Sequence, residues 1–136
     1  MKYYRQKKIA PEAATPETKS SNKNITDNSI PENDGKIKIV VQNPGELSRI
    51  VTVINTLEAL EELVQGDIQT VTLANGLILV MDVEGRLKGK PKNVHTRLYG
   101  DIVGTVFITR AEGESFVSLT PEQCQNARAW LLRHSV

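Results

Sequence analysis

The part of the sequence best suited to binding chemistry is the run EGRLKGKPKN at residues 84–93, in which a cation occupies every second position from 86 to 92. Gly85 and Gly89 allow the backbone to turn and to expose its N–H groups, as an anion-binding nest requires. A nucleoside-triphosphatase loop is excluded, because that motif has four residues between its glycines and a Ser or Thr after its lysine, whereas Pro91 follows Lys90 here. The run predicts either a loop that contacts a phosphate, a nucleotide or an acidic surface, or a solvated connection.

The candidate site extends from these cations, for which we expect no internal counter-ion, to two further polar residues. Asn93 can donate and accept hydrogen bonds at once, which suits a ligand contact or a bond that closes the turn. Asp101 lies near the start of the next expected strand and either borders the same site or ties the loop to that strand. The candidate binding residues are Arg86, Lys88, Gly89, Lys90, Lys92, Asn93 and Asp101.

Metal and thiol chemistry find little support in the remaining residues. His95 and His134 lie far apart, and neither has a second His or a Cys at ligand spacing, so we expect no metal site. Cys124 has no family signature around it and falls on the apolar stripe of the last expected helix. The pattern therefore predicts that Cys124 is a small buried side chain.

Composition divides the 136 residues into two parts. The formal net charge of +1 excludes a strongly basic nucleic-acid binder, and no apolar run approaches a membrane span, so we expect a cytoplasmic protein. Only three positions in residues 1–34 are occupied by Val, Ile, Leu or Phe, which predicts a disordered polar tail. The first eight residues, MKYYRQKK, form either a basic arm for nucleic acid or a solvated end. Residues 35–136 form the single expected domain.

The domain opens with two expected hairpins around a helix. Residues 36–42 and 47–54 alternate in hydropathy and flank the turn NPGE at 43–46, where Pro and Gly suit a type II turn. An amphipathic helix follows, with Asn55 as its N-cap and Gly66 in the left-handed position that ends it. Residues 68–74 and 77–83 then flank Asn75-Gly76, a two-residue hairpin signal. The apolar run at 77–81 predicts a strand covered on both faces.

The second half adds strands and a capped helix. A strand is expected at 102–109, interrupted at Gly104 by a bulge or a close backbone approach, and a short strand at 116–119. Thr120, Pro121 and Gln123 predict a helix with a capping box. The fold class is therefore α+β: a mainly antiparallel sheet of five or six strands with two helices on one face, in a β-grasp-like order at the start.

Several motifs between residues 36 and 119 resemble the bacterial and phage family catalogued as domain of unknown function 3846. They are NTLEALEELV at 55–64, EGRLKG at 84–89, DIVGT at 101–105 and FVSLT at 116–120. The chain departs from the family pattern at Val94, where members usually have an Arg directly after the Asn. The resemblance implies a small accessory product of phages, plasmids or other mobile elements, without an assigned reaction or active site.

Three classes of function remain open on this basis. We expect first a non-enzymatic binding module that acts on a host protein or nucleic-acid complex. The alternative is a protein that binds or sequesters a nucleotide or phosphate through the cationic loop. The third class is a small enzyme, which would need its acids and His95 to converge in one pocket; we expect no catalytic residues and no cofactor. The acids in question are Asp82, Glu84 and Asp101.

Overall fold

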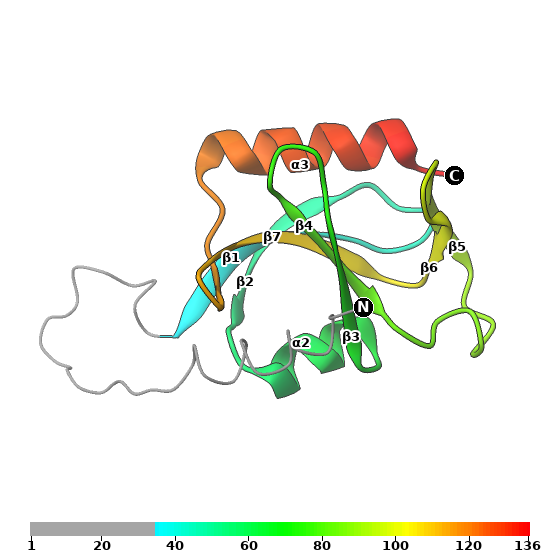
Figure 1. Ribbon diagram of the computed structural model, residues 1–136, viewed down its shortest axis with the longest axis horizontal. Helices are drawn as coiled ribbons and strands as arrows, with labels where there is room; N and C mark the ends of the chain where they lie inside the picture. Colours follow the sequence, from blue (N-terminus) through cyan, green and yellow to red (C-terminus); the bar gives the residue numbers. More distant parts are fainter. Residues whose placement is uncertain (1–34) are drawn as a thin grey trace, which may run out of the picture.

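The computed structural model describes residues 35–136, which form two helices and eight strands (Figure 1). The predictions of a disordered tail and a basic arm fall on residues 1–34, outside the described residues. In chain order the elements are β1 (Lys36–Gln42), β2 (Arg49–Ile54), α2 (Leu57–Val64), β3 (Ile68–Thr72), β4 (Ile78–Asp82), β5 (Lys92–Thr96), β6 (Gly100–Val103), β7 (Val106–Glu112), β8 (Ser115–Val117) and α3 (Pro121–His134).

The main sheet has six strands. Five follow the order β2-β1-β7-β4-β3, and β8 pairs with the C-terminal end of β7. Every pairing in it is antiparallel, which confirms the predicted fold class and the strand–strand–helix–strand–strand order at the start. Strands β5 and β6 form a separate antiparallel pair. Strand β5 was not predicted from the sequence, because Val94 is the one strongly apolar residue in it.

The two helices lie on opposite faces of the main sheet, so the expectation of one helical face is wrong (Figure 1). Strand β1 explains why: Ile39 and Val41 pack toward α2, whereas Val40 packs toward α3. Strand β4 divides in the same way, with Val80 on the α2 side and Leu79 on the α3 side. Central strands that are apolar on both faces need a cover on each. Within residues 35–136, no helix has the length and apolar character to cross a membrane.

Local signals locate the turns and helix ends, with three corrections. The 43–46 turn closes through Glu46 N–H donating to the Asn43 carbonyl, and α3 has its capping box, as predicted. Thr56, not Asn55, caps α2, since Asn55 is buried and donates to the Phe116 carbonyl at 3.0 Å. The β3–β4 loop has three residues rather than two, because Leu73 N–H bonds the Leu77 carbonyl. The third correction concerns the C-terminus of α2.

Helix α2 ends at Gln65, which adopts the left-handed conformation with φ 60°, rather than at Gly66. Gly66 is required for space instead, because a Cβ there would lie 2.3 Å from Asp82 Oδ1. The expected strand at 102–109 divides into β6 and β7 at Gly104, whose φ is +78°. A Cβ added at this position would lie 2.8 Å from the Lys90 side chain. Both glycines therefore leave room for a neighbouring side chain, Asp82 at Gly66 and Lys90 at Gly104.

Candidate binding site

The cationic loop between β4 and β5 is folded tightly on itself. Gly85 N–H donates to the Asp82 carbonyl, and Lys90 N–H donates to the Gly85 carbonyl, both at 3.1 Å. Gly89 turns with φ +73° and donates its N–H to the Arg86 carbonyl at 3.0 Å. The four cations at 86–92 divide into two pairs: Lys88 and Lys90 contact Asp82, whereas Arg86 and Lys92 contact Asp101, so they do not form one patch.

Lys88 and Lys90 both reach back to Asp82 at the end of β4. Their Nζ atoms lie 2.9 and 2.7 Å from Asp82 Oδ2, whose side chain is 1% exposed. Lys90 Nζ also donates to the Val64 carbonyl at 2.8 Å, and both lysines donate to the Gln65 carbonyl. We call these five residues the Asp82 clamp. It joins the end of β4, the loop and the C-terminus of α2, where positive charge is favoured by the helix dipole.

Opposing effects act on the Asp82 carboxyl. Burial is the largest and raises its pKa, but hydrogen bonds from Lys90, Lys88 and the Glu84 N–H outweigh burial and hold the pKa below its ordinary value. The same contact raises the pKa of Lys88. The expectation that these cations lack an internal counter-ion is therefore wrong, because sequence spacing does not show that Asp82, six and eight residues earlier, faces them.

Arg86 and Lys92 fasten a different part of the molecule, the β5–β6 pair. Arg86 Nε donates to the Asp101 carbonyl at 3.1 Å, and Nη2 donates to the carbonyls of Tyr99 and Asp101. The Asp101 carboxylate contacts His95 Nδ1 at 2.8 Å and Lys92 Nζ at 3.3 Å, and these contacts lower its pKa. Arg86 thus holds β6 beside the end of β4, and Asp101 joins β6 to β5.

Asn93 has a structural environment in the described domain. It is 1% exposed, its Oδ1 accepts from Gln42 Nε2 at 2.9 Å, and its Nδ2 donates to the carbonyls of Gln42 and Gly104 at 2.9 and 2.8 Å. Gln42 Nε2 also donates to Ser135 Oγ. These side-chain bonds join β5 to the end of β1 and to Gly104, so they connect distant parts of the chain rather than close the turn of the 84–93 loop.

Replacing Asn93 by alanine should lower the free energy of unfolding by about 2 kcal/mol, since it leaves the buried Gln42 and Gly104 groups without these partners. Urea unfolding followed by circular dichroism measures this loss. Asn126→Ala, at an exposed position of α3, is the matched control and should not lower stability, because alanine is the better helix former. An equally small effect at Asn93 would contradict the structural role.

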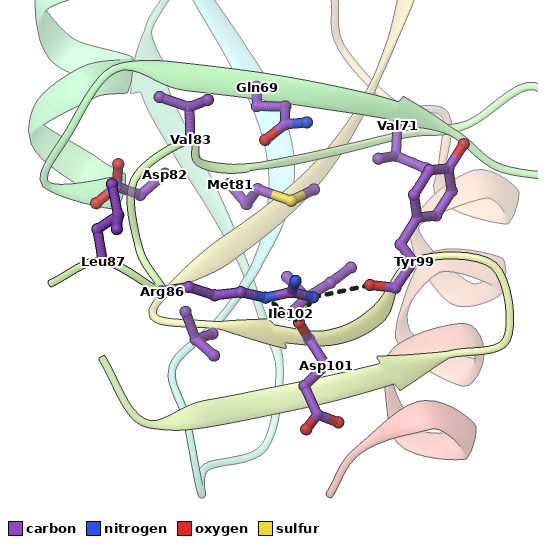
Figure 2. Close-up of a pocket in the computed structure, with 11 residues that line it drawn as sticks. Gln69, Val71, Met81, Asp82, Val83, Arg86, Leu87, Tyr99, Asp101 and Ile102 are labelled. Carbon is purple, nitrogen blue, oxygen red and sulfur yellow. Dashed lines mark hydrogen bonds between the residues drawn. The ribbon is translucent and has the colours of Figure 1, made fainter. Parts of the chain in front are cut away.

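A pocket lies between the β3–β4 end of the sheet and β6, with a volume of about 220 Å³ (Figure 2). Val71, Met81 and Ile102 give it an apolar lining, and the Gln69 amide and the Arg86 guanidinium add polar groups. Its exposed apolar residues are Val83, Leu87 and Tyr99, at 49, 87 and 45% exposure. Figure 2 shows the Met81 side chain above Arg86 and the Tyr99 ring beside Val71 at the edge of the pocket, whereas the Asp101 carboxylate points away.

Two of the candidate acids, Asp82 and Asp101, line this pocket, and the carboxylate of each has partners of its own. The Asp82 carboxylate belongs to the clamp, and the Asp101 carboxylate belongs to the contacts with His95 and Lys92. Among residues 35–136, no three His, Cys, Asp or Glu side chains gather as a metal site would require. Cys124 lies on the buried face of α3, where burial raises the pKa of its thiol. What the arrangement offers chemically is apolar burial with hydrogen-bond donors beside it.

The segment that contains the Asp82 clamp and the pocket matches a known protein family. Residues 37–132 match the family described as Domain of unknown function (DUF3846). The chain belongs to this family. The match runs from β1 into the last turn of α3, so the Asp82 clamp and the pocket both lie within the DUF3846 domain. Comparison with curated proteins and with solved structures gave no match.

The candidate residues thus have several roles in this DUF3846 domain. Arg86 and Asp101 line the pocket, whereas Lys88, Lys90, Lys92 and Asn93 have the contacts described above, and Gly89 shapes the loop. The sequence analysis did not select the apolar lining. One signal pointed to it: Leu87 and Tyr99, which both line the pocket, are large apolar residues in otherwise polar loops.

Proposed function

We propose that this domain is a non-enzymatic binding module whose pocket takes one apolar side chain of a partner protein. The pocket volume of about 220 Å³ is the observation that carries the proposal. Sites for drug-sized ligands and cofactors measure roughly 300–1,000 Å³, so this pocket suits a single large side chain better than a whole cofactor. Anchor side chains that fill such pockets dominate the binding energy of many protein interfaces.

The surroundings of the pocket support a protein partner. Val83, Leu87 and Tyr99 are exposed beside it, and aromatic residues and Arg are enriched in the centres of protein interfaces. Arg86 uses Nε and Nη2 to hold the backbone of β6, and its Nη1 makes no hydrogen bond to another residue in the part of the chain that the structure describes. A carbonyl or carboxylate oxygen next to the partner's apolar side chain could accept from Nη1.

The geometry argues against the alternative, a binder of nucleotides or phosphates through the cationic loop. Lys88 and Lys90 are committed to Asp82 and to the end of α2, and Lys92 lies beside Asp101. An incoming phosphate would have to displace a buried carboxylate from Lys90, whose side chain is only 16% exposed. Such a displacement costs free energy that a preorganised nest does not.

The biological setting belongs to the proposal as well. The resemblance to phage and plasmid accessory proteins supports an origin in a mobile element, and such a product would act on a protein of its host, in the cytoplasm. A nucleic-acid contact through the basic arm at residues 1–8 concerns the part of the chain outside the described residues.

The test compares two exposed leucines. The full chain, carrying an affinity tag, is used to capture host proteins as wild type, Leu87→Asp and Leu132→Asp; these leucines are 87 and 67% exposed, and only Leu87 lines the pocket. A partner of the pocket should be retained by wild type and Leu132→Asp and reduced at least ~10-fold by Leu87→Asp, since losing one apolar anchor costs over ~1.4 kcal/mol.

Two results would count against this function. One is a partner captured equally by wild type and by both variants, which would place its site elsewhere. The other is a thermal shift with nucleotides, which would favour the alternative, because a ligand at 100 times its Kd adds ~2.7 kcal/mol of stability. Circular dichroism of Leu87→Asp and Leu132→Asp serves as the folding control.

A further inference from the structure

Among residues 35–136, the main sheet ends in two strands, β2 and β3, that each pair with one neighbouring strand. They differ in exposure: Ile68 and Thr70 of β3 are 2 and 5% exposed, whereas Ile50 and Ile54 of β2 are 40 and 53% exposed. An edge strand offers a row of backbone donors and acceptors to another strand. Of the two edges, β2 is the accessible one.

The hydrogen-bond phase of β2 identifies which backbone groups it offers. Asn55 N–H donates to the Gly35 carbonyl at 2.7 Å, and the register pairs Lys36 with Ile54. Hydrogen-bonded pairs alternate along an antiparallel ladder, so the odd-numbered residues of β2 bond to β1. The even-numbered residues Ile50, Thr52 and Ile54 therefore direct their N–H and C=O groups away from the sheet.

We propose that this edge binds a second copy of the chain, with the two β2 strands pairing antiparallel about a twofold axis at Thr52. In that register Thr52 faces Thr52 of the second copy, and Ile50 faces its Ile54. All three outward-directed residues then exchange hydrogen bonds, and the exposed isoleucines form two cross-strand apolar pairs. No other register about a twofold axis uses all three, so the segment is self-complementary.

The charges at the two ends of β2 favour the same arrangement. Arg49 stands at its start, while the first turn of α2, with the exposed Glu58, begins just beyond its end. Antiparallel pairing brings Arg49 of each copy toward Glu58 of the other, whereas parallel pairing would place the two Arg49 side chains together.

Devices that block edge pairing are lacking in β2. Natural edges are protected by Lys, Pro or a β-bulge. Residues 49–54 contain no Lys and no Pro, and the β1–β2 register runs from Arg49 to Ile54 without a shift. Because six paired residues bury less than the ~1,000 Å² of a stable interface, we expect a weak dimer with a Kd on the order of 100 μM.

The experiment uses a matched pair of threonines. Thr52 and Thr72 are both exposed, lie on opposite edges of the sheet and direct their backbone groups outward. Sedimentation equilibrium of the full chain between about 10 μM and 1 mM should show a monomer–dimer equilibrium for wild type and for Thr72→Lys. Thr52→Lys places two like charges opposite each other and should weaken dimerisation at least ~10-fold.

Amide hydrogen exchange gives an independent measurement of the register. As wild-type concentration rises through the dimer Kd, the N–H groups of Ile50, Thr52 and Ile54 should gain protection, whereas that of Thr72 should not. A protein that stays monomeric up to about 1 mM would overturn the proposal. So would a dimer that Thr52→Lys leaves intact, since its interface would then lie elsewhere. These outcomes leave the pocket's role untouched, because Leu87 and Tyr99 are not part of this edge.

Discussion

Replacing Asp82 by alanine is expected to lower the free energy of unfolding by about 3–5 kcal/mol, the largest effect we predict for any single substitution outside the apolar core. The reason is the geometry of the clamp: the side chain is 1% exposed, and its Oδ2 lies 2.7 Å from the Nζ of Lys90, which is itself only 16% exposed. Removing the carboxylate leaves that ammonium group partly buried with only backbone carbonyls as acceptors. Denaturant unfolding followed by circular dichroism measures the loss.

Asp101→Ala is the matched control, since Asp101 also contacts two basic side chains. Its carboxylate is 34% exposed, and its partners Lys92 and His95 are 63 and 62% exposed. Exposed ion pairs contribute little to stability because solvent screens them, so this variant should lose far less stability than Asp82→Ala. If Asp101→Ala and Asp82→Ala proved equally stable, burial would not distinguish the two sites, and the structural role of the clamp would be refuted.

The clamp also predicts how stability depends on pH. Because the folded-state pKa of Asp82 is lowered below 3.8, the folded protein binds its proton less readily than the unfolded chain does. The carboxylate's contribution is therefore fully present above the unfolded value of about 3.9 and is lost as the pH falls through the lower folded value. The stability difference between wild type and Asp82→Asn should shrink below about pH 4, when both are followed by urea unfolding.

Local features of the fold were predictable from the sequence because local chemistry determines them. The capping box of α3 needs only Thr120 and Gln123 at the right spacing, and the 43–46 turn needs only Pro44 and Gly45. The doubly covered strand was predictable from the unbroken apolar run of β4. These patterns lie within a few residues of the chain, where spacing and geometry coincide.

Features that depend on distant residues were not predictable. Asn55 is a good N-cap by type, but its side chain bonds the Phe116 carbonyl, 61 residues away, and the cap passes to Thr56. The apolar run of β4 predicted a cover on both faces, but which element supplies each cover depends on strand neighbours such as β1 and β7, which are distant in the sequence. The candidate site divided for the same reason: the partners of Lys88 and Lys90 lie in β4 and at the end of α2.

The end of α2 gives the sharpest contrast between the two kinds of information. A glycine just after a helix usually occupies the left-handed position, where alanine costs roughly 1 kcal/mol. In the structure Gln65 occupies that position, and Gly66 lies against the carboxyl group of Asp82. The role of Gly66 is therefore steric, and the two explanations predict different results for the same substitutions.

Gly66→Ala should lower the free energy of unfolding by about 3 kcal/mol, because its Cβ would lie 2.3–2.6 Å from the three terminal atoms of Asp82. That carboxylate cannot move aside cheaply, since Lys88, Lys90 and the Glu84 N–H hold it in place. Gln65→Gly, measured in the same urea titration, should leave stability unchanged or raise it by less than about 1 kcal/mol, as glycine relieves the left-handed backbone.

Two outcomes would contradict the steric explanation. A loss near 1 kcal/mol for Gly66→Ala, with Asp82 titrating as it does in the wild type, would mean that the loop accommodates the methyl group. A loss of similar size in an Asp82→Ala background would show that the strain does not pass through the clamp, whereas the steric explanation requires the two effects to be strongly non-additive.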